Sequence, residues 1–279
     1  MNLNKLIEES KFNFLQLIDL EDGVVEVKMN RPEVHNAFND IFIEEVNSCF
    51  SNFNSVPDIT LVVLSAEGKS FSAGADLNWM KSMVSYSKQQ NQEDSTKLLN
   101  MFQAMDNLKC PLIGVVQGAA LGGGMGIVSC CDHVLSSDRA KFGFTEVRLG
   151  LVPAVISEFV YRKIGYSQCV SLFASGEIFK ANKAYDIGLV HQVVSGEDLE
   201  EAKNNIISQL KNNGPMAMTS AKSLAKGLLN FDPGFAQKRI DFQEKCVELI
   251  ADTRVTNEAQ EGMNALLEKR TANWIKDEN

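Results

Sequence analysis

Residues 118–132 read GAALGGGMGIVSCCD, and this stretch places three consecutive glycines, Gly122, Gly123 and Gly124, before a short apolar run. The run has a helical character, yet a glycine inside a helix costs about 0.5–1 kcal/mol relative to alanine. A buried type of strand, PLIGVVQGAA (111–120), comes directly before the glycines. The order of strand, glycines and helix start therefore needs an explanation in packing or in ligand binding.

A second junction of the same kind is LVVLSAEGKSFSAGAD (61–76). The first N–H groups of a helix have no partner inside the helix and lie at the positive end of its dipole. Two such junctions on neighbouring strands can aim two N–H groups at one oxygen, which would make an oxyanion hole. The alternative without a ligand is a tight turn that lets helix and strand pack closely. A dinucleotide-binding G-x-G-x-x-G is disfavoured, because Ile127 or Ser129 stands where the third glycine belongs.

The hydrophobic pattern predicts strands that alternate with helices in the first two thirds of the chain. Asn39 is expected to cap a helix over 40–53, and such alternation favours crossover units and a partly parallel sheet. From about Asp198 onward the pattern changes to four amphipathic helical segments. We therefore expect a core over 1–197 and a helical region over 198–279. The expected strands are 14–20, 23–29, 59–66, 111–120, 133–137 and 140–144.

Composition and charge narrow the classes of function. The 279 residues carry a net charge of −9, which argues against a nucleic-acid surface and against binding to an anionic membrane. The six cysteines form no C-x-x-C pair, and this pattern is typical of reduced, buried thiols in an intracellular protein. No ligand spacing for zinc, secretory segment or run of about 18 apolar residues occurs, so we expect a soluble cytoplasmic protein without a metal site.

Five motifs are distributed along the chain: NRPEVHNAFN (30–39), SFSAGADLNWM (70–80), GAALGGGMGIVSCCD (118–132), AKFGFTEVRLGLVP (140–153) and GLVHQVV (188–194). In order and spacing they resemble the enoyl-CoA hydratase/isomerase, or crotonase, family, and EGMNALLEKR (261–270) resembles its closing helix. The resemblance implies an α/β fold of stacked ββα turns with two roughly perpendicular sheets and a helical C-terminal trimerisation region. It also implies an acyl-CoA substrate, no separate cofactor, since coenzyme A is part of the substrate, and a homotrimer or a dimer of trimers.

The resemblance also implies roles for individual residues. The backbone N–H groups of Ala75 and Gly123 would form the oxyanion hole, and Glu146 would transfer the proton beside the thioester. Asp76 is expected to cap the helix that follows Ala75. The bases His35 and His133 are less favoured for catalysis than Glu146. The residues expected at the substrate or the coenzyme A moiety are His35, Ala37, Ala73, Gly74, Asp76, Leu77, Gly122 and Gly126.

One position departs from the family pattern. Hydratases with two carboxylates place a first glutamate where this chain has Gly126, and Glu146 is the second. The sequence also resembles a narrower group, bacterial 3-methylglutaconyl-CoA and carboxygeranoyl-CoA hydratases, which share this lack and act on substrates with a distal carboxylate. Arg162 or Lys163 could hold that carboxylate, or both could lie on a solvated helix face. Hydration of 3-methylglutaconyl-CoA in leucine degradation is the first hypothesis; a single-glutamate double-bond isomerase and a non-catalytic coenzyme A-binding homologue are the alternatives.

Overall fold

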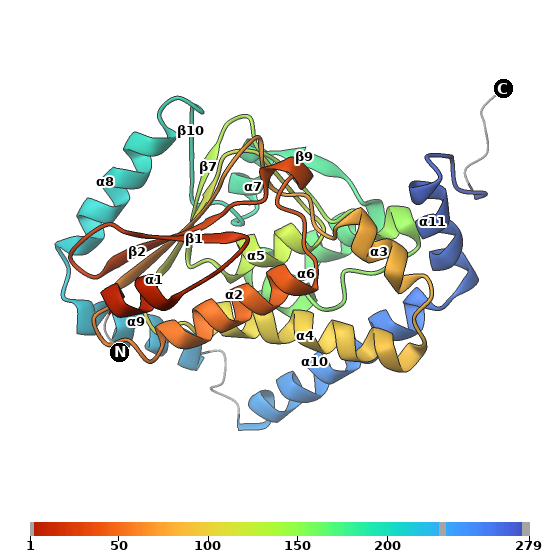
Figure 1. Ribbon diagram of the computed structural model, residues 1–279, viewed down its shortest axis with the longest axis horizontal. Coiled ribbons are helices and arrows are strands. Elements are labelled where there is room, and N and C mark those ends of the chain that lie inside the picture. The colour runs from red at the N-terminus through yellow and green to blue at the C-terminus, as the bar shows by residue number, and fades with distance from the viewer. Residues whose placement is uncertain (1–2, 229–232, 275–279) are drawn as a thin grey trace.

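The computed structural model describes residues 3–228 and 233–274, and within them the strands form two sheets (Figure 1). The larger sheet has the order β1-β2-β3-β5-β7-β10, in which β1 and β2 pair antiparallel and the other pairs are parallel. Its strands are β1 (Leu15–Asp19), β2 (Val24–Met29), β3 (Leu61–Ala66), β5 (Leu112–Val116), β7 (His133–Ser137) and β10 (Gln192–Val194).

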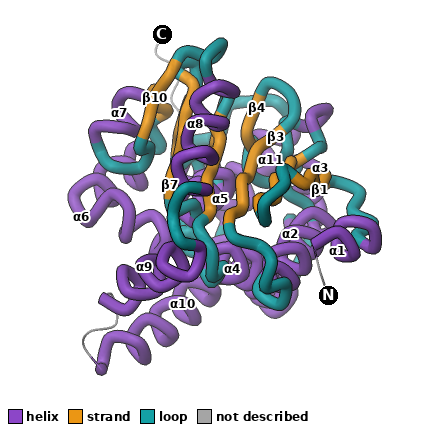
Figure 2. The backbone as a smooth tube through the Cα atoms, turned by 90° about the vertical axis from the view of Figure 1, so that its left-hand side faces the viewer, coloured by secondary structure: helices purple, strands orange, loops and turns teal. Residues whose placement is uncertain are grey.

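Helices cover both faces of the larger sheet, because its central strands are apolar on both sides (Figure 2). Val24, Val63 and Ile113 face α8, whereas Val25 and Val62 belong to the main core with α2 and α4. Asn39 caps α2 by accepting a hydrogen bond from the N–H of Phe42, as the sequence predicted. These helices are α2 (Asp40–Phe53), α4 (Lys88–Asp106) and α8 (Leu199–Lys211); α1 (Leu3–Glu9) and the 3₁₀ helix η1 (Pro32–Val34) flank β2.

The smaller sheet has the order β4-β6-β8-β9. Its strands β4, β6 and β8 each come directly after a strand of the larger sheet, so the chain passes repeatedly from one sheet to the other. Residues 111–120 are therefore not one strand, as expected, but two strands in different sheets. The break falls at Gly118, where a Cβ atom would lie 2.0 Å from the carbonyl oxygen of Lys69. The strands are β4 (Ser70–Ser72), β6 (Ala119–Leu121), β8 (Lys141–Gly143) and β9 (Ile178–Lys180).

Helices follow these strands, and three of them, α3, α5 and η2, contribute residues to the main cavity described below. The helical region between β4 and β5 is divided into α3 and α4, because Ser87 starts α4 with a capping box that includes Gln90. Arg162 and Lys163 were expected on a helix, which is the kinked helix α6, but its bounds were not predicted, and α7 was not predicted at all. These elements are α3 (Leu77–Met83), α5 (Gly123–Cys130), η2 (Glu146–Leu149), α6 (Ser157–Ser175) and α7 (Ala181–Asp186).

After β10 the described elements are helices, as the pattern from Asp198 predicted. Two of them reach the functional region: α10 packs along α4, and α11 packs on η2 and α3. Gly262 of α11 lies so close to η2 that a Cβ atom there would be 2.4 Å from the carbonyl oxygen of Leu149. Among the described residues, no helix is both long and apolar enough for a membrane span. The helices are α9 (Pro215–Leu228), α10 (Pro233–Arg254) and α11 (Asn257–Leu267).

Candidate active site

A cavity of about 620 Å³, here called the main cavity, lies between the two glycine-containing junctions and the C-terminal helices. Most of its lining is apolar and comes from the two junctions, the loop 151–156 and parts of α3, η2, α10 and α11. Glu146 is the one aspartate or glutamate that lines it in the part of the chain that the structure describes. Seven of the residues predicted for the site line this cavity: Ala73, Gly74, Ala75, Leu77, Gly122, Gly123 and Glu146.

The first junction leaves the N–H of Ala75 free. Phe38 forms a parallel bridge with Ala75, in which the Phe38 N–H donates to the Gly74 carbonyl at 2.7 Å. The Asp76 N–H donates back to the Phe38 carbonyl at 2.8 Å. In this pattern the groups on either side of Ala75 face Phe38, so the N–H of Ala75 points away from it. It donates no hydrogen bond within the described residues.

The second junction places the N–H of Gly123 beside the first. A Cβ atom on Gly74 would lie 3.4 Å from the Gly123 nitrogen, so the two junctions are in contact. Gly123 begins α5, and its N–H, too, makes no hydrogen bond in the described part of the chain. Both amides therefore lie beside one cavity with their donors available.

Packing explains two of the three glycines as well. A Cβ atom at Gly123 would lie 2.7 Å from the ring of Phe38, and one at Gly124 would lie 2.7 Å from the carbonyl oxygen of Ser72. Gly122 has φ +51°, a left-handed conformation that favours glycine. The close packing of helix and strand, which was the alternative to ligand binding, is thus present, and the N–H of Gly123 is available as well. Packing and ligand binding are therefore compatible explanations for the glycines.

Glu146 begins η2 and approaches the glycines from the opposite side. A Cβ atom on Gly122 would lie 3.6 Å from its Oε1. Its Oε2 is shielded from solvent and has no hydrogen-bond partner within the described residues. Burial raises the pKa of the Glu146 carboxyl from 4.5 to about 7, although a hydrogen bond from its own backbone opposes this shift. A carboxyl group with such a pKa can both take up and release a proton near neutral pH.

Asp76 holds the first junction in place. Its Oδ1 accepts hydrogen bonds from the N–H groups of Asn78 and Trp79 at the start of α3, so the expected cap is present. Its Oδ2 lies 2.7 Å from Nη1 of Arg31, which also donates to the Ala37 carbonyl. Asp76 is buried and does not line the main cavity. Its contacts serve to position Ala75.

Gly126 is buried inside α5 and does not line the main cavity. A Cβ atom there would lie 2.5 Å from Cγ2 of Ile156 and 2.7 Å from the ring of Phe102. The expectation that Gly126 contacts the substrate is therefore wrong. The space that a glutamate would need at this position is filled by the two apolar side chains.

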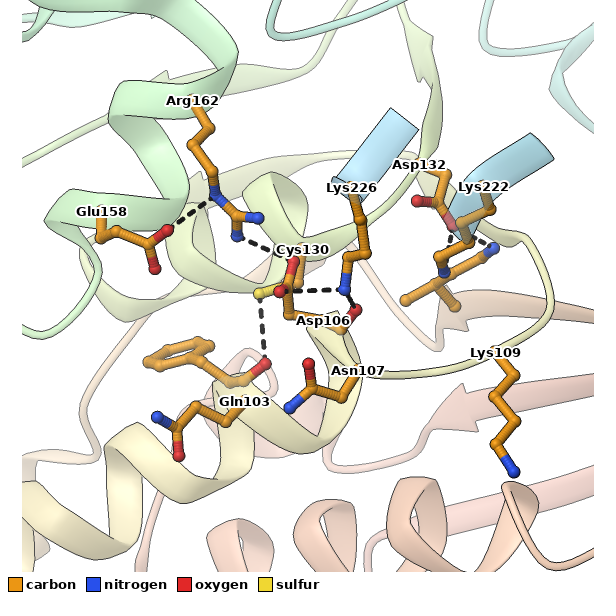
Figure 3. Close-up of polar contacts among 12 residues, drawn as sticks. Gln103, Asp106, Asn107, Lys109, Cys130, Asp132, Glu158, Arg162, Lys222 and Lys226 are labelled. Carbon is orange, nitrogen blue, oxygen red and sulfur yellow. Dashed lines mark hydrogen bonds and ion pairs between the residues drawn. The ribbon is translucent and has the colours of Figure 1, made fainter. Parts of the chain in front are cut away.

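Arg162 and Lys163 are not at the main cavity either, so neither can hold a distal carboxylate there. Figure 3 shows Arg162 on α6 directed at Asp106 and Glu158, with ion-pair distances of 2.8 and 3.0 Å. Lys163 donates to the carbonyl oxygen of Cys131 at 2.6 Å. The alternative of a solvated helix face is also wrong, because Arg162 is largely buried.

His35 and Ala37 lie outside the main cavity, on the turn that leads to Phe38. The carbonyl oxygen of His35 accepts a hydrogen bond from the Ala73 N–H at 3.0 Å, and its Nδ1 lies 3.1 Å from the Ser70 hydroxyl. This turn therefore borders the strand that leads to Ala75. A contact with coenzyme A at either residue stays a prediction.

The chain is similar in sequence to a known family of enzymes. The model of the enoyl-CoA hydratase/isomerase family matches residues 19–277, which is most of the chain. The chain belongs to this family. A crotonyl-CoA hydratase from Syntrophomonas wolfei is 30% identical over 265 residues, covering 93% of this chain and 97% of the relative. A trans-2-decenoyl-[acyl-carrier-protein] isomerase from Streptococcus mutans is 28% identical over 256 residues, 91% of this chain and 95% of the relative.

The family's solved structures share the fold. A crystal structure of a putative enoyl-CoA hydratase/isomerase (crotonase) from Legionella pneumophila superposes with a TM-score of 0.75 at 38% identity, covering 95% of this chain and all of that one. The α/β crotonase fold, with two sheets and C-terminal helices, is therefore confirmed, and the chain is an enzyme of the enoyl-CoA hydratase type.

The sequence of this enoyl-CoA hydratase/isomerase family member did not predict that its C-terminal helices contribute residues to the main cavity. Arg254 of α10 and Arg270, which follows α11, line the main cavity together with Arg148 of η2. Arg254 lies in no motif, and EGMNALLEKR (261–270), which ends at Arg270, indicated a helix but no contact with the cavity; each arginine reaches the cavity through packing between segments more than 100 residues apart in the chain. Trp79 and Met80 of α3 both line the cavity and are largely buried in the core.

Proposed function

We propose that the enzyme adds water to the double bond of an α,β-unsaturated acyl-CoA through a thioester enolate. The N–H groups of Ala75 and Gly123 would hold the thioester oxygen, where negative charge develops during the reaction. The observation that carries this proposal is the meeting of two backbone N–H groups with the Glu146 carboxyl in a single cavity; within the described residues neither N–H donates a hydrogen bond, and the shielded Oε2 of Glu146 has no partner. Each removed oxyanion donor typically costs on the order of 10²–10³ in kcat.

Glu146 would carry out both proton transfers. Its carboxylate takes a proton from water as the water oxygen forms a bond to Cβ, and the electrons of the double bond move to the thioester, which becomes the enolate. The protonated carboxyl then gives that proton to Cα and the enolate collapses, so that water is added and Glu146 returns to its starting state. A single carboxylate is enough for this cycle, which suits a cavity with no second acid among its described lining residues.

For the acyl group we propose 3-methylglutaconyl, which places the reaction in leucine degradation. The proposal is supported by the similarity of FSAGADLNWM (71–80) and TEVRLGLVPAVIS (145–157) to hydratases that lack the first glutamate. It is also supported by the cationic side chains in an otherwise apolar cavity.

Double-bond isomerisation is the second candidate. It is favoured by the packing of Phe102 and Ile156 over Gly126, which leaves Glu146 without a second carboxylate to bind water. An isomerase needs one group that moves a proton between two carbons, and a relative named as an isomerase is 28% identical. Glu146 has the pKa and the shielding for that task.

The test is to offer the purified protein three thioesters, crotonyl-CoA, 3-hexenoyl-CoA and 3-methylglutaconyl-CoA, and to follow the absorbance of the conjugated thioester. Hydration removes this absorbance, and isomerisation of 3-hexenoyl-CoA creates it. We expect the fastest loss with 3-methylglutaconyl-CoA. A gain with 3-hexenoyl-CoA and no loss with the other two would decide for the isomerase.

The pH dependence follows from the raised pKa of Glu146. Because the cycle starts from the carboxylate, kcat/KM is expected to be constant above about pH 7 and to fall as pH drops below that value. The fall should approach tenfold per pH unit below pH 6 and should report the pKa of the free enzyme. A profile that is flat between pH 5 and 8 would show that Glu146 does not act as the base.

We also propose a homotrimer or a dimer of trimers. Tyr161, Tyr166 and Val170 of α6 expose large apolar side chains, which a partner subunit could cover. Light scattering should then give three or six times the chain mass of 30.8 kDa.

A further inference from the structure

We propose that Arg254 is a specificity-determining residue, and that its guanidinium binds a carboxylate at the far end of the acyl chain. This inference rests on the proposed function, since it assumes that the main cavity holds the acyl group. It names a residue that the sequence did not suggest and replaces Arg162 and Lys163 in the role of anchor.

Arg254 is a buried cation in the wall of the main cavity. Its side chain is 8% exposed and ends α10, next to the residues of α11 that close the cavity. In the described part of the chain, both hydrogen bonds of its guanidinium come from Nη1, to Asp94 Oδ2 at 2.9 Å and to the Ser95 hydroxyl at 3.3 Å. Its Nε is shielded from solvent and has no hydrogen-bond partner there.

An unpartnered donor in such a place is unfavourable, because a buried N–H without an acceptor gives up its hydrogen bond to water and gains none in the protein. The guanidinium is a planar fork of five donors that fits a carboxylate with two parallel hydrogen bonds. Asp94 occupies one side of this fork through a single nitrogen. A second carboxylate could bind through the remaining nitrogens, and it would bring the acceptor that Nε lacks.

The other two arginines at the cavity fit this role less well. Arg270 donates to both carboxylate oxygens of Glu261, at 2.6 and 2.8 Å, and to Glu268 at 2.6 Å, so its fork is occupied. Arg148 is exposed, and an ion pair in contact with water contributes little to binding because the solvent screens the two charges. Arg254 alone among the three combines burial with an unused donor in the described structure.

The surroundings of Arg254 also favour a ligand that is apolar except at the end that meets the guanidinium. Asp94 on α4 holds the guanidinium from behind, and Tyr86 lies close enough to interact with its charge. Burial raises the pKa of the Asp94 carboxyl and lowers the pKa of Arg254, although each opposes the shift of the other. The rest of the wall near α10 and α11 is apolar, including Ile250, Ala265 and Leu266. An acyl chain with an apolar middle and an acidic end matches this order of surfaces.

The experiment compares binding of two saturated thioesters that cannot react, glutaryl-CoA and hexanoyl-CoA, by titration calorimetry. In Arg254→Met, the Kd for glutaryl-CoA should rise by about 10- to 100-fold while that for hexanoyl-CoA changes little, as expected for the loss of a charge-assisted hydrogen bond. Arg254→Lys keeps a positive charge beside Asp94 without the fork, and should lose most of the preference as well. An unchanged ratio of the two Kd values in Arg254→Met would overturn the inference.

Two further variants keep the test decisive. If Arg254→Met fails to fold because Asp94 is left without its partner, the double variant Asp94→Asn/Arg254→Met removes both charges, and the same ratio is measured. Arg139→Met is the control, because Arg139 pairs with Glu197 away from the main cavity, and this variant should leave the ratio unchanged. Because the ligands are saturated, a protein that binds glutaryl-CoA through Arg254 but hydrates none of the three test thioesters would refute the proposed function alone. Active hydration with no dependence on Arg254 would refute this inference alone.

Discussion

Replacement of Glu146 by Gln is expected to lower kcat by about 10²–10⁴-fold, which is the usual contribution of a general acid–base group. The amide has nearly the same shape as the carboxyl group but cannot exchange a proton with Cα or with water. Binding of a saturated acyl-CoA should change by less than threefold, because the two backbone amides are untouched. The check is steady-state kinetics on the best of the three test thioesters, with titration calorimetry on its saturated analogue.

Measurements of stability distinguish a lost proton transfer in Glu146→Gln from misfolding of the variant. The carboxyl of Glu146 has a pKa of about 7 in the folded protein and 4.5 ordinarily, so the folded state binds the proton more tightly than the unfolded state does. As pH rises from 4.5 through 7, the wild type therefore loses up to roughly 3 kcal/mol that the Gln variant does not lose. The variant should gain Tm relative to the wild type between pH 5 and 8. Glu44→Gln, on the exposed face of α2, is the control and should change neither kcat nor this pH dependence.

Introduction of the missing carboxylate as Gly126→Glu is expected to destabilise the fold rather than to improve hydration. The new Cβ would overlap Ile156 and Phe102, and the carboxylate would be buried in an apolar layer without a partner. Overpacking costs about 1–3 kcal/mol and an unpaired buried charge costs several more, so we expect a loss of at least about 4 kcal/mol. Urea unfolding measures this loss directly.

A glycine-to-glutamate substitution at an exposed position provides the control. Gly227 in α9 is exposed and a Cβ atom there meets nothing within 4 Å, so Gly227→Glu should leave stability unchanged or raise it. If Gly126→Glu instead folds with wild-type stability and raises the rate of hydration, the apolar layer over Gly126 is not an obstacle. That result would contradict our explanation of why Glu146 acts alone.

Local patterns predicted much of the fold. The cap at Asn39, the strand over 133–137 and the helices after Asp198 depend on neighbouring residues, and the structure has each of them. The division of 111–120 between two sheets could not be predicted, because it depends on the contact of Gly118 with Lys69, almost 50 residues earlier in the chain. The same holds for α6, whose weak amphipathic pattern is interrupted by Gly165 with φ +71°.

The residues of the candidate site, too, could be predicted from the sequence only in part. Ala75, Gly123 and Glu146 were found because each belongs to a motif, and the structure brings them to one cavity. Gly126 also belongs to a motif, but only the packing of Phe102 and Ile156 shows that its side of α5 is closed. Arg254 carries no local signal, since its position depends on how α10 lies along α4.

The central claim is that two backbone amides hold the thioester oxygen. It is tested most directly by a crystal structure of Glu146→Gln with its unsaturated acyl-CoA bound. We predict that the nitrogens of Ala75 and Gly123 both lie about 2.7–3.1 Å from the thioester oxygen. A structure in which that oxygen contacts neither amide, while the acyl chain still occupies the main cavity, would contradict the account.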